Sequence, residues 1–423
     1  MQFKKTVLDN GLRIITAPQP GNLAVTLLIL VEAGSKYESE RSRGISHFLE
    51  HMCFKGTEKR PTTNQIASEL DGIGASYNAF TGMEYTGYYA KAEARHFNKV
   101  LDLVSDLYLH PTFPAAEIQK ERGVIVEEIN MLEDDAPHKV GEIFMDLMYG
   151  NQPAGWDVTG PKKNILSFKR DDFIKYRGDH YLADATTVIV AGSFDEASVV
   201  KEIAATFRNV KVGNKKGKVK TIEKQKKPAL SIQYKKFDQT HIVLGVRAYD
   251  VFNKRKFALE ILAHILGGGM SSRLFDKLRN DLGAAYYVSA DADSYTDHGY
   301  LSVSAGIDKN KLKEVLKAIL DQFNALKAKP VHKAELDKVK NHLSGIIILG
   351  LETSNRLASF YGSQEVIEKQ ILTPEEIIKR LNAVTAEEVM EVAKDIFKND
   401  KLNLAVLGPI KDKKGIQKIL RLD

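Results

Sequence analysis

The chain has 423 residues, of which 43% are hydrophobic and 27% are charged, and this composition is typical of a globular protein. Its length exceeds one ordinary hydrophobic core, so we expect two to four domains. Apolar runs such as residues 25–31 are too short to cross a bilayer. No apolar signal segment follows the first lysines, and the single Cys53 excludes an intrachain disulfide. We therefore expect a cytoplasmic protein without a membrane partner, and secretion by an unrecognised route is the alternative.

Near the N-terminus, His47, Glu50 and His51 form the pattern H-x-x-E-H. At about 100° per helical residue, these three side chains share one stripe of a helix. The opposite face is apolar and contains Ile45, Leu49 and Met52. Neutral imidazoles suit Zn²⁺, and a nearby carboxylate can take a proton from water on the metal; this order of residues is the inverzincin signature. An ordinary amphipathic helix with a polar face is the alternative, so a third ligand has to decide.

Residues 115–134 predict a second helix whose apolar stripe includes Ile125, with Val124 beside it. Glu121 and Glu128 fall within this stripe, whereas Glu127 projects to the polar side. Carboxylates on a core-facing stripe are costly unless they are paired or bound to a metal. The helical phase therefore favours Glu128 as the third ligand, with Glu121 behind it. A buried salt bridge is the alternative.

The net charge of +6 is concentrated in residues 211–227, which contain eight lysines and one acid, Glu223. A nucleic-acid site would be expected to have interleaved aromatic residues or a recognised fold signature, and this segment has neither. We interpret residues 213–228 as a solvated, lysine-rich linker and expect no nucleic-acid partner. The linker divides the chain into an N-terminal half, 1–212, and a C-terminal half, 229–423.

The two halves share a pattern of local elements. The sequence G-A-x-Y begins at Gly74 and again at Gly283, and each copy leads into two predicted strands and then a helix, near 96–109 and 309–326. We predict an α+β fold made by tandem duplication of an α/β unit, with a largely antiparallel sheet flanked by helices. Chance similarity between short elements is the alternative.

The H-x-x-E-H motif, followed at a long interval by Glu121 and Glu128, resembles the family of pitrilysin, insulysin and mitochondrial processing peptidase. The resemblance covers nearly the whole chain and is closest to the short, processing-peptidase-like bacterial members. It implies a zinc metalloendopeptidase in which His47, His51 and Glu128 bind one Zn²⁺ per chain. In this family the residue matched by Glu50 is the base, and the residue matched by Glu121 supports the site. The resemblance further implies a homodimer, and two halves that form a clamshell enclosing an extended or unfolded peptide.

Two other segments resemble parts of the same family. The L-R-(six residues)-Y spacing at Arg279 and Tyr286 resembles that of two residues that reach the zinc-bound peptide, and both side chains can donate to a carbonyl or its oxyanion. The N-A-x-T segment resembles an edge strand beside the zinc, where an extended peptide can add as another strand. The residues of this segment are Asn78, Ala79, Phe80 and Thr81. The alternatives are a helix-end arginine, a packed tyrosine and an internal strand.

Three functions are compatible with this resemblance. The leading hypothesis is an active endopeptidase, engaged either in specific processing or in general peptide degradation. A catalytically silent structural subunit is the main alternative, since the same fold serves as a scaffold in a respiratory complex. A partner that lacks independent activity is the third. Because one chain contains every residue of the expected site, the sequence favours the enzyme.

Overall fold

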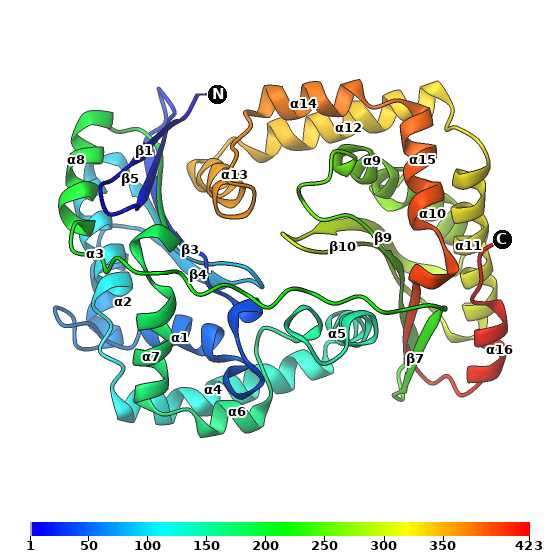
Figure 1. Cartoon of the computed structure of the whole chain (residues 1–423), viewed down its shortest axis with the longest axis horizontal. Coiled ribbons are helices and arrows are strands. Elements are labelled where there is room, and N and C mark those ends of the chain that lie inside the picture. Colours follow the sequence, from blue (N-terminus) through cyan, green and yellow to red (C-terminus); the bar gives the residue numbers. More distant parts are fainter. Residues whose placement is uncertain (1) are drawn as a thin grey trace. The chain divides into compact units, whose positions relative to one another are not determined.

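The computed structural model describes residues 2–423 and has a mixed α/β fold with two sheets flanked by helices (Figure 1). This confirms the predicted fold class. The chain forms two compact units. Unit 1 contains residues up to 129 together with 157–219 and 347–374, and unit 2 contains the remaining segments, 130–156, 220–346 and 375–423. Each unit therefore includes one segment from the opposite half of the sequence.

The sheet of unit 1 has the strand order β1-β2-β6-β3-β5-β4. The strands are β1 (Lys4–Val7), β2 (Arg13–Pro18), β3 (Ala24–Val31), β4 (Ser76–Thr81), β5 (Thr86–Glu93) and β6 (Thr186–Gly192). Only the β2–β6 pair is parallel, so the sheet is largely antiparallel. The order places β4 at one edge of the sheet.

Helices cover both faces of this sheet. They are α1 (Ile45–Cys53), α2 (Thr63–Gly72), α3 (Phe97–Leu109), α4 (Ala115–Asp134, in unit 1 as far as Ile129), α6 (Lys162–Ser167), α7 (Arg170–His180), α8 (Glu196–Phe207) and α13 (Ser354–Ile367). Successive strand residues point to opposite faces, so Leu27 packs in the core with Phe48 of α1, whereas Leu28 packs with Tyr361 of α13. Segment 347–374 belongs to unit 1 because α13 covers this second face.

The sheet of unit 2 has the order β7-β11-β8-β10-β9, again with one parallel pair, β7–β11. The strands are β7 (Ala229–Tyr234), β8 (Gln239–Arg247), β9 (Ala285–Ser294), β10 (Gly299–Asp308) and β11 (Leu402–Gly408). The helices are α5 (Ala136–Tyr149), α9 (Lys256–Gly267), α10 (Arg273–Phe275), α11 (Leu312–Ala328), α12 (Lys333–Gly350, in unit 2 as far as Ile346), α14 (Pro374–Ala383), α15 (Ala386–Ile396) and α16 (Lys413–Ile419). Phe144 of α5 packs with Val243 and Leu407, and so α5 covers this sheet as α13 covers the other.

The lysine-rich segment differs from the solvated linker that we expected. Lys215 pairs with Glu32 and Lys218 pairs with Glu84, and both glutamates are only 4% exposed. Burial alone would raise the pKa of Glu32, but Lys369 and Lys215 bring that pKa below its ordinary value. Residues 215–218 are therefore fixed on unit 1, because buried carboxylates require a cationic partner. The segment is thus anchored at Lys215 and Lys218, its other residues are half-buried or exposed, and its role as a linker stays a prediction.

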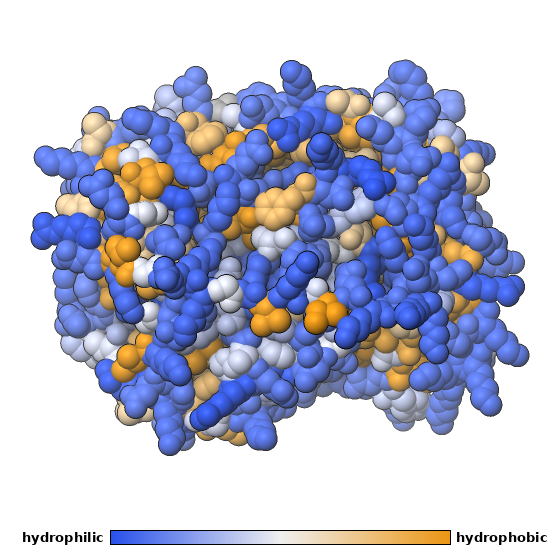
Figure 2. All heavy atoms as spheres, viewed as in Figure 1, coloured by the Kyte–Doolittle hydropathy of each residue, from blue (hydrophilic) through white to orange (hydrophobic). Residues whose placement is uncertain are grey.

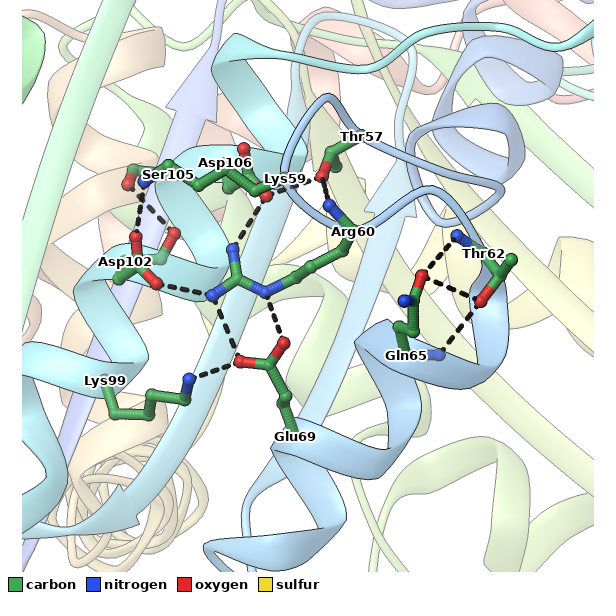
Figure 3. A network of polar contacts seen from close by, with 10 residues as sticks. All are labelled: Thr57, Lys59, Arg60, Thr62, Gln65, Glu69, Lys99, Asp102, Ser105 and Asp106. Carbon is green, nitrogen blue, oxygen red and sulfur yellow. Dashed lines mark hydrogen bonds and ion pairs between the residues drawn. The ribbon is translucent and has the colours of Figure 1, made fainter.

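A buried arginine ties the segment after α1 to its neighbours (Figure 3). Arg60 is 5% exposed and donates to Glu69 of α2 at 2.9 Å and to Asp106 of α3 at 2.7 Å. It also contacts Asp102 of α3. Thr57 donates to the same Asp106 carboxylate at 2.6 Å. These bonds hold the connection from α1 to α2, and α2 leads into the edge strand β4.

The face of the molecule in Figure 2 is mainly hydrophilic, with apolar side chains scattered over it. Within residues 2–423, no helix combines the length and the apolar character that are needed to cross a bilayer.

Candidate metal centre

Helix α1 is held at its first turn by a buried carboxylate. Glu38 is 3% exposed and accepts hydrogen bonds from the backbone N–H groups of Gly44 and Ser46, both at 2.8 Å. Burial raises the pKa of Glu38 to about 8, against the opposing effect of these donors. Gly44 has φ +89°, and an added Cβ would lie 2.5 Å from the carbonyl oxygen of Thr159, so glycine is required here. The first turn of α1 is therefore fixed by the carboxylate of Glu38 and by the close packing of Gly44 against Thr159.

The structure brings together His47, His51 and Glu128, the three expected ligands. One ligand atom from each residue lies within 4.8 Å of the other two, and residues 2–423 contain no other His/Cys/Asp/Glu group of this kind. Nε2 of His47 and Nε2 of His51 each lie 3.6 Å from an oxygen of Glu128. Tetrahedral zinc with bonds of about 2.0–2.2 Å separates its ligand atoms by roughly 3.3–3.6 Å. This donor set fits zinc in both chemistry and spacing.

Helix α4 has the bounds that we expected, and its phase separates the two adjacent glutamates. Glu127 is exposed, whereas Glu128 reaches the histidines and its side chain is 30% exposed. Val124 is 52% exposed, so the expectation that it lies beside the buried stripe is wrong. Val124 lies one helical turn before Glu128. This edge of the apolar stripe of α4 is therefore open to solvent and is not packed in the core of unit 1.

Glu121 orients one of the two histidines. Its Oε1 lies 2.9 Å from Nδ1 of His51, and its Oε2 lies 2.7 Å from Nζ of Lys55. Burial would raise the pKa of Glu121, but the hydrogen bonds from His51 and Lys55 bring it below its ordinary value. A carboxylate on the second ring nitrogen fixes the tautomer that leaves Nε2 free for a metal. The alternative of a buried salt bridge is also realised here, through Lys55, a residue that the sequence analysis missed.

His47 has no such partner. Its Nδ1 is buried and makes no hydrogen bond within the described residues. Burial, followed by the proximity of His51, lowers the pKa of His47 to about 4, so the ring is neutral at physiological pH. A neutral imidazole is the form that coordinates zinc.

Glu50 lies on the same helix, and its carboxylate is held by the edge strand. Thr81 of β4 donates from Oγ1 to Oε2 of Glu50. Burial raises the pKa of Glu50, and the Thr81 bond acts against this shift. Asn78, Ala79 and Phe80 precede Thr81 on β4, which pairs on one side only, with β5. The expected edge strand is thus present, and Thr81 connects it to Glu50.

Arg279 and Tyr286 belong to unit 2, where they are neighbours. Arg279 lies in a π-helical turn, Asp276–Asp281, and its Nη1 donates to the carbonyl oxygen of Tyr286 and, at 3.4 Å, to that of Ala285. Tyr286 lies near the start of the edge strand β9 and is 60% exposed. Its phenol is therefore accessible, and the role of both residues toward a peptide remains a prediction.

Comparisons with known proteins agree with this fold and site. Residues 13–162 match the family described as Insulinase (Peptidase family M16), and residues 167–343 match the Peptidase M16 inactive domain. The chain therefore belongs to the M16 peptidase family. This confirms the resemblance to pitrilysin and insulysin. The first match contains the complete His47, His51 and Glu128 group, and the second contains Arg279 and Tyr286.

Similar chains extend over almost the full length. A protein named as an uncharacterized zinc protease of Bacillus subtilis is 35% identical over 408 residues, which is 96% of this chain and 98% of the relative. One with the same description from Rickettsia bellii is 34% identical over 410 residues, with the same coverage. The crystal structure of a protease from Helicobacter pylori has a TM-score of 0.88 at 22% identity, covering 96% of this chain and 99% of that one. The Pseudomonas fluorescens structure described as a peptidase M16 inactive domain has a TM-score of 0.89 at 17% identity, covering 97% and 99%. These two structures support the fold.

Proposed function

We propose that this protein is a zinc-dependent metalloendopeptidase that binds one Zn²⁺ through His47, His51 and Glu128. The observation that carries the proposal is the convergence of these three donors, with the second nitrogen of His51 already held by Glu121. Relatives that are named zinc proteases support the choice of metal. Three protein ligands leave a fourth position open, which is typical of a catalytic site and not of a structural zinc site.

Bound zinc would supply Lewis acidity that polarises the scissile carbonyl and lowers the pKa of water. Glu50 would accept the proton of the attacking water and return it to the nitrogen of the leaving amine. Thr81 occupies Oε2 of Glu50, so Oε1 is the oxygen that remains for proton transfer. Glu121 would keep His51 in one tautomer throughout the reaction.

The substrate that fits best is an extended peptide or an unfolded segment. The unpaired side of β4 offers backbone donors and acceptors to another strand, and such pairing requires an extended chain. We propose that Asn78, Ala79, Phe80 and Thr81 bind the peptide in this way. Arg279 and Tyr286 would donate to its carbonyl groups or to the developing oxyanion.

The experiment that tests this function combines metal analysis with peptide turnover. Purified protein should contain one zinc per chain and should cleave a pool of random peptides. A denatured protein should be digested faster than its folded form. A zinc-replete protein without peptide turnover would support the silent structural subunit instead. Sedimentation would test the homodimer, and fractionation of cells would test the cytoplasmic location.

A further inference from the structure

Unit 1 contains a second concave site, separate from the metal centre. It is a cavity of about 680 Å³ lined by residues from the segments 37–45, 167–180 and 216–217. One face of α7 forms much of its wall, and Ile45, the first residue of α1, forms another part. None of the three proposed zinc ligands lines it. A ligand in this cavity would therefore lie outside the peptidase site.

Cationic side chains outnumber acidic ones around this cavity. Arg41, Lys169 and Lys175 line it, and within residues 2–423 none of the three has a carboxylate oxygen within 4.0 Å. A fourth cation, Lys216, is already paired with Asp179 at 2.6 Å. A cleft lined by an excess of one charge raises the local concentration of ions of the opposite sign.

The two acids on the wall are both engaged. Asp179 accepts from Lys216, and Asp172 accepts from the backbone N–H of Lys169 at 2.8 Å. Lys216 neutralises Asp179, and the charge of Asp172 offsets one of the other cations, so four cations and two acids leave a net charge of +2 on the wall. An added anion would balance this net positive charge.

A buried histidine fixes part of the wall of this cavity. His180 lines the cavity and is 6% exposed, yet its Nδ1 makes no hydrogen bond within the described residues. Its ring packs against Tyr176 with centroids 4.4 Å apart and against Tyr37 at 5.9 Å, so the ring position is fixed. Nδ1 is closed off from solvent, and burial lowers the pKa of His180 to about 4, so the ring forms a fixed part of the wall that adds no charge at neutral pH.

We propose that this cavity binds a small soluble compound that carries a phosphate group. Arg41, Lys169 and Lys175 would contact the phosphate oxygens. A phosphate group suits three cations better than a carboxylate does, because it has about two charges at neutral pH and more acceptor oxygens. The volume also leaves room for an organic part beside the phosphate. This proposal is independent of the peptidase function.

The test is calorimetric titration of the full-length, zinc-loaded protein with inorganic phosphate and with a soluble phosphate monoester, at constant ionic strength. We expect saturable binding of one anion per chain. The double variant Lys169→Met/Lys175→Met should raise the Kd at least about 10-fold, because two charge-assisted contacts are lost. Lys201→Met/Lys317→Met is the matched control: it removes two exposed lysines elsewhere and should leave the Kd unchanged.

Three results would overturn the assignment. Absence of saturable binding, or equal weakening in both double variants, would show that only general electrostatics or the zinc attracts phosphate. Vesicles that contain an anionic phospholipid distinguish a lipid headgroup from a soluble ligand. If these vesicles retain the wild-type protein in preference to the Lys169→Met/Lys175→Met variant, the cavity serves a membrane lipid and the small-ligand proposal is wrong. Equal retention of both proteins supports the proposal.

Discussion

Thr81 donates a hydrogen bond from Oγ1 to Oε2 of Glu50 at 2.5 Å, which connects the edge strand β4 to the carboxylate between the two histidines. The same strand is the proposed binding site of the peptide backbone. The residue that ends this strand is thus also the one that orients the proposed base.

Replacement of Thr81 by valine should lower kcat about 10–100-fold, since a hydrogen bond to a charged group contributes about 1.5–3 kcal/mol. Thr81→Ser retains the hydroxyl and should restore most of the rate, and both variants should keep their zinc. Ser76→Ala, at the other end of β4, is the control. Unchanged kcat in Thr81→Val would show that Glu50 does not need this orientation.

Replacement of Glu50 by glutamine should leave zinc content and folding intact while peptide cleavage falls about 10²–10⁴-fold, because a general base is lost. Zinc is measured by mass spectrometry and turnover with a peptide pool. Near-normal turnover in a zinc-replete Glu50→Gln protein would exclude Glu50 as the base.

The adjacent glutamates of α4 offer a matched pair of variants. Glu128→Gln should weaken zinc binding strongly, whereas Glu127→Gln should not, because Glu127 is exposed and outside the donor group. Glu121→Gln should have an intermediate effect, about 10–100-fold in affinity or activity, as is typical for a residue that orients a ligand. Zinc affinity is measured by competition with a chelator, and the reverse order for 127 and 128 would refute the ligand assignment.

Tyr286→Phe should reduce kcat or raise KM at constant zinc content. An oxyanion donor contributes about 3–4 kcal/mol, and a residue that only positions the peptide contributes less. Tyr234→Phe is the control, since Tyr234 is also exposed, at 54%, and belongs to the same unit. Identical kinetics for the two variants would remove Tyr286 from the site.

Arg60→Met should lower the free energy of unfolding by about 3–5 kcal/mol, because it leaves Asp106 buried without its cation. Arg95→Met, which breaks the exposed pair with Glu93, should change it by less than about 1 kcal/mol. Denaturant titration compares the two. Equal effects would show that the network in Figure 3 contributes no more to stability than a surface ion pair does.

The sequence by itself was sufficient for features that depend on local periodicity. The phase of residues 115–134 favoured Glu128 over Glu127, and the structure places these two side chains accordingly. Helical spacing likewise grouped His47 and His51, and the repeated G-A-x-Y pattern predicted two sheets with helices. These features are fixed by the rotation per residue of a helix and by the alternation of a strand, both of which are visible within one segment.

Only the tertiary structure decided which distant segments meet. Lys215 and Lys218 pair with the buried carboxylates of Glu32 and Glu84, although the sequence of this segment predicts a solvated linker. Segments 130–156 and 347–374 each join the unit of the opposite half, because α5 and α13 cover its sheet. Val124 is exposed in spite of its apolar character, and Thr81 reaches a carboxylate 31 residues away. Such contacts depend on how the folded chain brings remote surfaces together, and no local periodicity encodes them.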